Sequence, residues 1–268
     1  MNLCIFFEGT GQGVAGRITN VTRLHDLCVD DAGQKLHLES GSGTRFGAYL
    51  GGTIIGIDWR NIFRLARRWF ESSYESLPKE GTRTDIFLFG FSRGALLARH
   101  FAAWLDKLGL PVTYLGLWDT VDATVGLDVA ETCPPNVKHA RHAVSRDETR
   151  RFFRLVPLHG EKKRVTEMMF PGSHSDVGGL YADNHLVADL TLAWVAAGAK
   201  RAGLRLKKGV RLTQKLDASA VVLHDSHTLT SNLWGAFGPV GRDLSGVRLH
   251  PACRGIENGA GARKDPPS

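Results

Sequence analysis

The feature of this sequence that most constrains its fold is the stretch 85–94, Asp-Ile-Phe-Leu-Phe-Gly-Phe-Ser-Arg-Gly. An apolar run leads into Gly90, Ser92 and Gly94, which form the pattern G-x-S-x-G, and a helical pattern follows. A strand that turns directly into a helix forces its central residue into strained backbone angles, and glycines on both sides remove clashing side chains. The pattern predicts a turn that presents the Ser92 hydroxyl as a nucleophile above the carboxyl edge of a sheet.

A serine in this pattern is also typical of a simple helix cap, so the flanking sequence has to decide between the two interpretations. Residues 86–90 are typical of a buried parallel strand, and apolar residues recur at helical spacing over 96–108 until Gly109 and Pro111 end the pattern. The free N–H groups at the start of such a helix would face a developing oxyanion. This context favours the catalytic turn.

The rest of the chain alternates between apolar runs and helical patterns. The predicted strands cover 3–7, 86–90, 112–118, 164–170 and 220–223. The predicted helices cover 17–28, 61–77, 96–108, a helix opened by the capping box Ser145-x-x-Glu148, and 186–203. This order predicts an α/β protein with a mostly parallel sheet and helices on both faces. We expect one domain over 1–268, with a frayed polar tail at about 255–268 and a glycine-rich active-site loop at 36–56.

Candidate catalytic partners of Ser92 lie at the ends of other predicted strands. Asp119 follows the strand 112–118 and His174 follows the strand 164–170, so both belong at the same sheet edge as Ser92. A serine needs a base and the base needs an orienting acid, and the chain order serine, acid, histidine is that of the α/β-hydrolases. We expect the backbone N–H groups of Thr10 and Arg93 to form the oxyanion hole.

A rival assignment obeys the same order. It pairs Ser92 with Asp176 and with either His224 or His227, which follow the last predicted strand. Asp119 is also typical of a residue that caps a helix or closes a turn. The residues alone leave both assignments open.

Composition restricts the other function classes. The net charge of +7 suits an acidic membrane surface, but the basic clusters lack any recognisable nucleic-acid module, so we expect no nucleic-acid partner. The four cysteines lie far apart, so we expect reduced thiols, no metal site and no cofactor. No apolar run approaches the roughly 18 residues of a membrane span, and the N-terminus reads as a strand rather than a signal peptide. We therefore expect the chain to be cytoplasmic as synthesised.

Four ordered motifs carry a resemblance to a known family. They are Phe-Phe-Glu-Gly-Thr-Gly at 6–11, Phe-Leu-Phe-Gly-Phe-Ser-Arg-Gly-Ala at 87–95, Leu-Gly-Leu-Trp-Asp-Thr-Val at 115–121 and Phe-Pro-Gly-Ser-His-Ser-Asp-Val-Gly-Gly at 170–179. Together they resemble the α/β-hydrolase family of type VI secretion lipase effectors of the first lipase class. The resemblance implies Ser92 as nucleophile, Asp119 as acid and His174 as base, and so favours the first assignment. The chain departs from the family at Glu8, where an aspartate is usual.

The resemblance implies a bacterial serine ester hydrolase, a lipase or phospholipase that cleaves phospholipid acyl esters. It further implies secretion by a type VI system into target cells, where lipids are degraded, and a secretion spike or an immunity protein as partner. With lipid or ester as substrate, we expect transient contact with a membrane surface. Two alternatives remain: a catalytically silent protein that keeps the hydrolase fold for binding, and a basic nucleic-acid binder.

Overall fold

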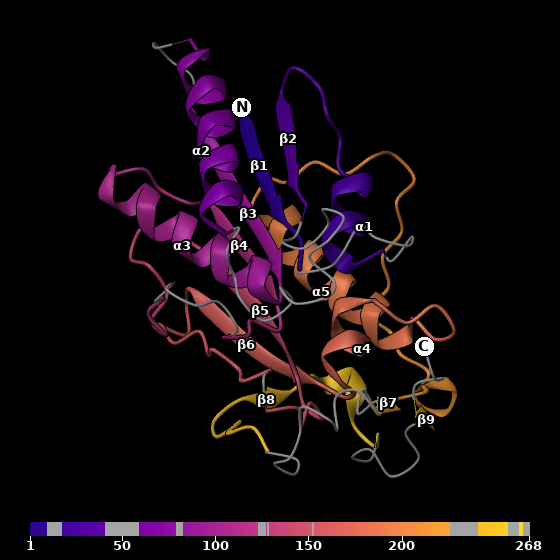
Figure 1. Ribbon diagram of the computed structural model, residues 1–268. Helices are drawn as coiled ribbons and strands as arrows, with labels where there is room; N and C mark the ends of the chain where they lie inside the picture. Colours follow the sequence, from indigo (N-terminus) through magenta and orange to yellow (C-terminus); the bar gives the residue numbers. More distant parts are fainter. Residues whose placement is uncertain are drawn as a thin grey trace, which may run out of the picture.

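The computed structural model contains a parallel sheet with helices on both of its faces (Figure 1). The structure describes residues 1–9, 18–40, 59–78, 83–122, 127, 129–151, 153–225, 241–256 and 263–264. Within these residues the sheet has seven strands, all of whose pairings are parallel. In spatial order they are β2 (Gln34–Glu39), β1 (Asn2–Phe7), β3 (Asp85–Phe91), β4 (Tyr114–Trp118), β5 (Ala140–Ser145), β6 (Val165–Phe170) and β8 (Arg248–Leu249).

The register of the strands brings their carboxyl ends to one edge. Phe7 of β1 is opposite Gly90 of β3, and Phe91 of β3 is opposite Trp118 of β4. From β1 the chain crosses to β2 on one side, and it later returns to place β3 on the other side. The carboxyl ends of β1 and β3 therefore flank the point where the strand order reverses, which is where open α/β sheets bind their ligands.

Two helices cover one face of the sheet, and two others cover the opposite face (Figure 1). The first pair is α2 (Trp59–Glu75) and α3 (Arg93–Lys107); the second pair is α1 (Asn20–Leu27) and α5 (Leu186–Arg201). Side chains of a strand alternate between faces, so Ile5 and Phe7 pack with α3 while Phe6 packs with α1 and α5. The central strands β1, β3 and β4 consist almost entirely of apolar residues because both of their faces are buried.

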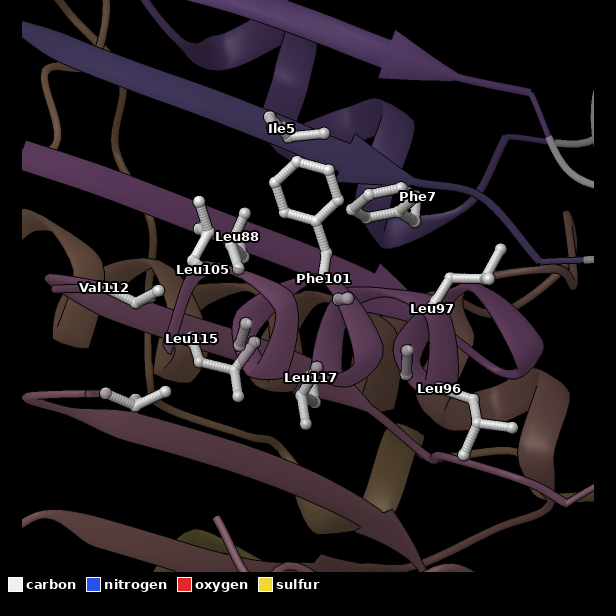
Figure 2. Close-up of a cluster of buried hydrophobic side chains, with 14 of the residues drawn as sticks. Ile5, Phe7, Leu88, Leu96, Leu97, Phe101, Leu105, Val112, Leu115 and Leu117 are labelled. Carbon is white, nitrogen blue, oxygen red and sulfur yellow. The ribbon is translucent and has the colours of Figure 1, made fainter. Parts of the chain in front are cut away.

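The packing of α3 fixes the position of the turn that precedes it. Phe101 and Leu105 of α3 lie over Leu88 and Leu115 of the central strands (Figure 2). All four side chains are fully buried, at 0% exposure. Burying a large apolar side chain stabilises a fold by about 1.5–3 kcal/mol, so this layer holds the start of α3 against the sheet.

The fold agrees with the predicted α/β-hydrolase architecture, but three local predictions are wrong. Residues 34–39, partly expected in a loop, form the edge strand β2. Ser145 ends strand β5 instead of opening a helix, and no helix follows it within the described residues up to Arg164. The strand predicted at 220–223 begins only at β7 (His224–Asp225), after a short 3-10 turn, η2 (Ala218–Ala220).

Parts of the C-terminal region lie within the described residues and contact the rest of the chain. The two-residue strand β9 (Arg263–Lys264) pairs with β7, and the carbonyl of Ile256 accepts a hydrogen bond of 2.9 Å from Arg146 Nη1. The turn η3 (Pro251–Cys253) lies between β8 and Ile256. Among the described helices, none is long and apolar enough to span a bilayer.

Candidate active site

Ser92 occupies a strained turn between β3 and α3. Its backbone angles are φ 60° and ψ −128°, a region that residues with a side chain rarely adopt. The Ser92 N–H donates to the carbonyl of Trp118 over 3.0 Å, which fixes the turn to the end of β4. The turn predicted from the sequence is therefore present, with Ser92 between a buried strand and the N-terminus of a helix.

The glycines beside Ser92 are required by close backbone contacts. A Cβ atom at Gly90 would lie 2.5 Å from the carbonyl oxygen of Gly94, and one at Gly94 would overlap the carbonyl oxygen of Phe7. A Cβ at Gly9 would lie 3.3 Å from the Cβ of Ser92. Gly9, which follows β1, thus lies directly against the serine turn.

The predicted oxyanion hole is described only in part. Arg93 is the first residue of α3, so its N–H lies at the N-terminus of this helix, beside Ser92. Thr10 lies outside the described residues, although Gly9 before it contacts the turn at Ser92. The pairing of these two donors stays a prediction.

Glu8, where the family usually has aspartate, connects the end of β1 to the start of α1. Its carboxylate accepts hydrogen bonds from Thr19 Oγ1 at 2.6 Å, Thr22 N at 3.0 Å and Gly9 N at 3.2 Å, and also from Thr22 Oγ1. Glu8 is 6% exposed, so these bonds replace those that it would make with water. The longer side chain joins β1, the following loop and helix α1.

Asp119 and His174 form a buried hydrogen-bonded pair at the same edge of the sheet. His174 Nδ1 lies 2.6 Å from Asp119 Oδ2, and the two residues are 3% and 0% exposed. Asp119 directly follows β4 and has a φ of 41°, whereas His174 is the first residue of the short helix α4 (His174–Gly178) after β6. An ionised carboxylate only accepts hydrogen bonds, so Nδ1 carries the proton and Nε2 is left as the basic nitrogen.

Aromatic rings hold the imidazole of His174 beside the turn. The ring of Phe91, the residue before Ser92, stacks on His174 with centroids 4.4 Å apart, and Phe153 contacts its edge at 4.9 Å. A side chain at Gly178 would overlap the Phe91 ring, so helix α4 can approach it only with glycine there. Within the described residues, no hydrogen bond joins Ser92 Oγ to His174 Nε2. Catalytic hydrogen bonds are often long in a free enzyme and shorten when substrate binds.

Asp119 has two further partners that the sequence did not reveal. The Ser145 N–H donates to its Oδ1 over 2.8 Å, and Arg242 donates to both carboxylate oxygens, at 2.6 Å from Nη1 and 3.0 Å from Nη2. Arg242 lies in a stretch without periodicity or motif and is one of 34 basic residues, so no sequence signal distinguished it.

The charges around this pair oppose the effect of burial on Asp119. Burial alone would raise the pKa of Asp119, but the charge of Arg242 and the hydrogen bond from His174 hold it far below its ordinary value. Burial lowers the pKa of His174, and the hydrogen bond and charge of Asp119 only partly offset this. At neutral pH the site thus contains a carboxylate and a neutral imidazole, the forms that a general base and its orienting acid require.

The rival pair is also present but is arranged differently. His224 Nδ1 lies 2.6 Å from Asp176 and its Nε2 lies 3.0 Å from Asp183, so carboxylates hold both ring nitrogens. Burial would lower the pKa of His224, but the two aspartates outweigh it and raise the pKa. Tyr181 stacks on the ring with centroids 3.7 Å apart. This arrangement favours an imidazolium that donates twice over a free base; His227, the other rival base, lies outside the described residues.

Among the residues that the structure describes, no group of three or more histidine, cysteine, aspartate or glutamate side chains is placed to hold a metal ion. The cysteines Cys4, Cys28, Cys133 and Cys253 are all buried free thiols.

The parallel sheet, the helices on both faces and the strained serine turn define an α/β-hydrolase. The family described as the type VI secretion (T6SS) Tle1-like phospholipase effector, catalytic domain, matches residues 1–111 and 110–198. The chain belongs to this family, which confirms the resemblance seen in the four motifs.

Two solved structures are similar in fold. One is the Tle1 effector bound to the VgrG spike from the type 6 secretion system, with 23% identity and a TM-score of 0.51, over 67% of this chain and 51% of that one. The other is an uncharacterised protein from Pseudomonas aeruginosa, with 21% identity and a TM-score of 0.56, over 77% and 46% of the two chains. The chain thus spans about half the length of these two proteins. A comparison with curated protein sequences finds no match.

Proposed function

We propose that the protein is a serine ester hydrolase that cleaves acyl esters of phospholipids, with Ser92 as nucleophile, His174 as general base and Asp119 as the acid that orients it. The observation that carries the proposal is the buried Asp119–His174 pair, joined over 2.6 Å beside the strained turn at Ser92. Membership of a family of phospholipase effectors supports an acyl ester as substrate.

In the proposed reaction, His174 Nε2 accepts the Ser92 proton as Oγ bonds to the ester carbonyl carbon. The Arg93 and Thr10 N–H groups stabilise the resulting oxyanion, and the N-terminal end of α3 adds a favourable dipole. The imidazolium then protonates the departing alcohol, and the acyl group stays on Ser92. A water molecule, deprotonated by His174, releases the fatty acid and restores the serine.

A groove supports contact with a lipid surface. It has a volume of about 1160 Å³, and its lining includes Phe153 and Arg242, which contact the catalytic pair, and the cations Arg154, Lys162 and Arg248. The side chains of these three cations make no hydrogen bond or ion pair with the described part of the chain. Acidic residues also line it: Glu131, Glu167 and Asp243. Each exposed cation near an acidic bilayer contributes about 1 kcal/mol of attraction, which would bring the enzyme to its substrate.

Delivery by a type VI system into target cells is part of the proposal. The similar Tle1 effector is bound to a VgrG spike, which supports a spike as partner of this chain. An immunity protein is the other expected partner, since a phospholipase would also attack the membranes of its own cell. We propose that residues 1–268 act as one catalytic domain.

The test compares hydrolysis of labelled phospholipid vesicles with that of a short soluble ester. Wild type, Ser92→Ala, His174→Ala and His224→Ala are assayed, and a fluorophosphonate probe reports labelling of Ser92. We expect wild type to cleave vesicles, and Ser92→Ala and His174→Ala to be inactive. Cleavage of the short ester alone would contradict the phospholipid substrate. If wild type cleaves neither and does not label, the protein is a silent binding protein with a hydrolase fold.

A further inference from the structure

Within the described residues, the buried guanidinium of Arg242 donates to the proposed catalytic acid, Asp119, and to backbone carbonyls. Its side chain is 5% exposed. Besides the two bonds to Asp119, Nη1 donates to the Ser145 carbonyl at 3.2 Å and Nη2 donates to the Phe153 carbonyl at 2.7 Å. Arg242 lies beyond residue 198, where the family match ends. A segment outside that match thus enters the catalytic site.

The charged groups that act on the His174 imidazole come from two other segments of the chain. Asp119 follows β4, whereas Glu148 and Arg150 follow β5. Glu148 accepts from the His174 N–H at 3.2 Å and is paired with Arg150 over 2.7 Å. Each carboxylate near the imidazole therefore has its own arginine: Arg150 for Glu148 and Arg242 for Asp119. Within α4 itself, Asp176 is engaged by His224.

We propose that Arg242 is a positioning residue that neutralises the charge of Asp119 and so keeps His174 in its neutral, proton-accepting form at mildly acidic pH. An uncompensated carboxylate beside His174 would stabilise the imidazolium and raise the apparent pKa of the pair. With the guanidinium bonded to both of its oxygens, Asp119 still orients the imidazole ring of His174. Its charge then stabilises the protonated form of His174 less strongly. The effect of Arg242 on the protonation of His174 does not depend on the proposed function. Only the expected effect on the rate of ester hydrolysis rests on it.

The experiment measures the pH profile of kcat/KM for ester hydrolysis and, separately, the imidazole pKa of His174 by NMR. Arg242→Gln removes the charge but keeps a donor, and Arg242→Lys keeps the charge. In Arg242→Gln we expect the acidic limb and the NMR pKa to move up by about one unit or more, because an unbalanced charge at this distance shifts a pKa by roughly 1–3 units. Arg242→Lys should keep both near wild type and lower kcat. The control Arg254→Gln, at an exposed arginine of the same segment that does not line the groove, should change neither the pH profile nor the NMR pKa.

An unchanged pKa in folded Arg242→Gln would overturn the inference, even if wild type cleaved no ester, because the NMR measurement does not need activity. If wild type cleaves no ester yet the pKa moves, the proposed function fails and the electrostatic role stands. Should Arg242→Gln not fold, Asp119→Asn/Arg242→Gln leaves no unpaired buried charge. With neither charge present, its NMR pKa for His174 should lie near that of wild type, where the two charges cancel, and a rise of one unit or more would contradict the neutralisation.

Discussion

The Nδ1 atom of His174 lies 2.6 Å from the Oδ2 atom of Asp119, between the ends of two strands that are separated in the sheet by β5. This bond fixes the tautomer of the imidazole and aligns its other nitrogen for proton transfer. It also makes the site sensitive to the relative positions of β4, β5 and β6, because each of these strands bears a partner of Asp119 or His174 at its end.

Replacement of Ser92, the proposed nucleophile, should affect activity and stability separately. Ser92→Ala and Ser92→Gly should each lower ester turnover by about 10⁵-fold or more. Ser92→Gly should also be more stable than Ser92→Ala, because glycine adopts a φ of 60° without strain. In urea unfolding, the free energy of unfolding should be about 1 kcal/mol higher for Ser92→Gly. Equal unfolding midpoints would contradict the strained turn.

The two buried histidines should respond differently to substitution. His174→Ala should be as inactive as Ser92→Ala, whereas His224→Ala should keep turnover because both nitrogens of His224 are already bound by carboxylates. Activity is measured on a short ester after circular dichroism has verified folding. Loss of turnover in folded His224→Ala with full activity in His174→Ala would reverse the assignment in favour of Asp176 and His224.

The raised pKa of His224 predicts a pH dependence of stability. Burial would lower this pKa, but Asp176 and Asp183 raise it above the unfolded value of 6.5. The histidine therefore stabilises the fold fully below about pH 6.5, and its contribution is lost as the pH rises through the folded pKa. The measurement is urea unfolding of wild type and His224→Gln from pH 5 upward. The difference between their free energies of unfolding should shrink as the pH rises. A difference that grows with pH would be inconsistent with the double ion pair.

Glu8 should matter for both the loop after β1 and helix α1. Glu8→Gln keeps the length of the side chain but removes the charge, and Glu8→Asp keeps the charge but shortens its reach to Thr19 and Thr22. Since loss of a helix cap costs about 1 kcal/mol, each variant should be less stable by roughly that amount. Because Gly9 contacts the turn at Ser92, kcat should also fall more than KM changes. Wild-type kcat in Glu8→Asp would mean that the loop does not depend on this link.

The positive charge in the groove should affect the rate of vesicle hydrolysis and not that of soluble esters. Lys162→Glu and Arg248→Glu should slow hydrolysis of acidic vesicles, and the wild-type rate on them should fall with added salt, because screening weakens surface attraction. The matched control is Arg68→Glu on α2, which lies far from β6 and β8 in Figure 1, and residues of these two strands line the groove. Equal losses in the control would indicate a general effect of net charge.

The sequence predicted the central elements well because their patterns are strong. Strands β1 and β3 are continuous apolar runs, and α3 has regular apolar spacing next to glycines that only a tight turn needs. Strand β2, Gln-Lys-Leu-His-Leu-Glu, was partly assigned to a loop because it lies at the edge of the sheet and alternates with polar residues. Strand β5, Ala-Arg-His-Ala-Val-Ser, contains few typical strand residues and is held by its neighbours on both sides.

For the candidate site, local patterns could place Ser92, Asp119 and His174 at strand ends but could not choose between His174 and His224. That choice depends on which carboxylates surround each ring, which only tertiary structure reveals. Arg242 was not found because its role comes from burial against Asp119 and from no pattern in the neighbouring residues.

The parallel arrangement of the sheet also has a consequence for how the protein folds. Each parallel pairing needs a long crossover connection, so none of the seven strands can form a local hairpin with its neighbour. A chain whose contacts are mostly non-local folds slowly, because the entropy of closing long loops is lost before the stabilising contacts form. Asp119, His174 and Arg242 come from segments far apart in the chain and meet only when the sheet is nearly complete. Hydrolytic activity should therefore appear in the last kinetic phase of refolding, after most of the helical signal has returned.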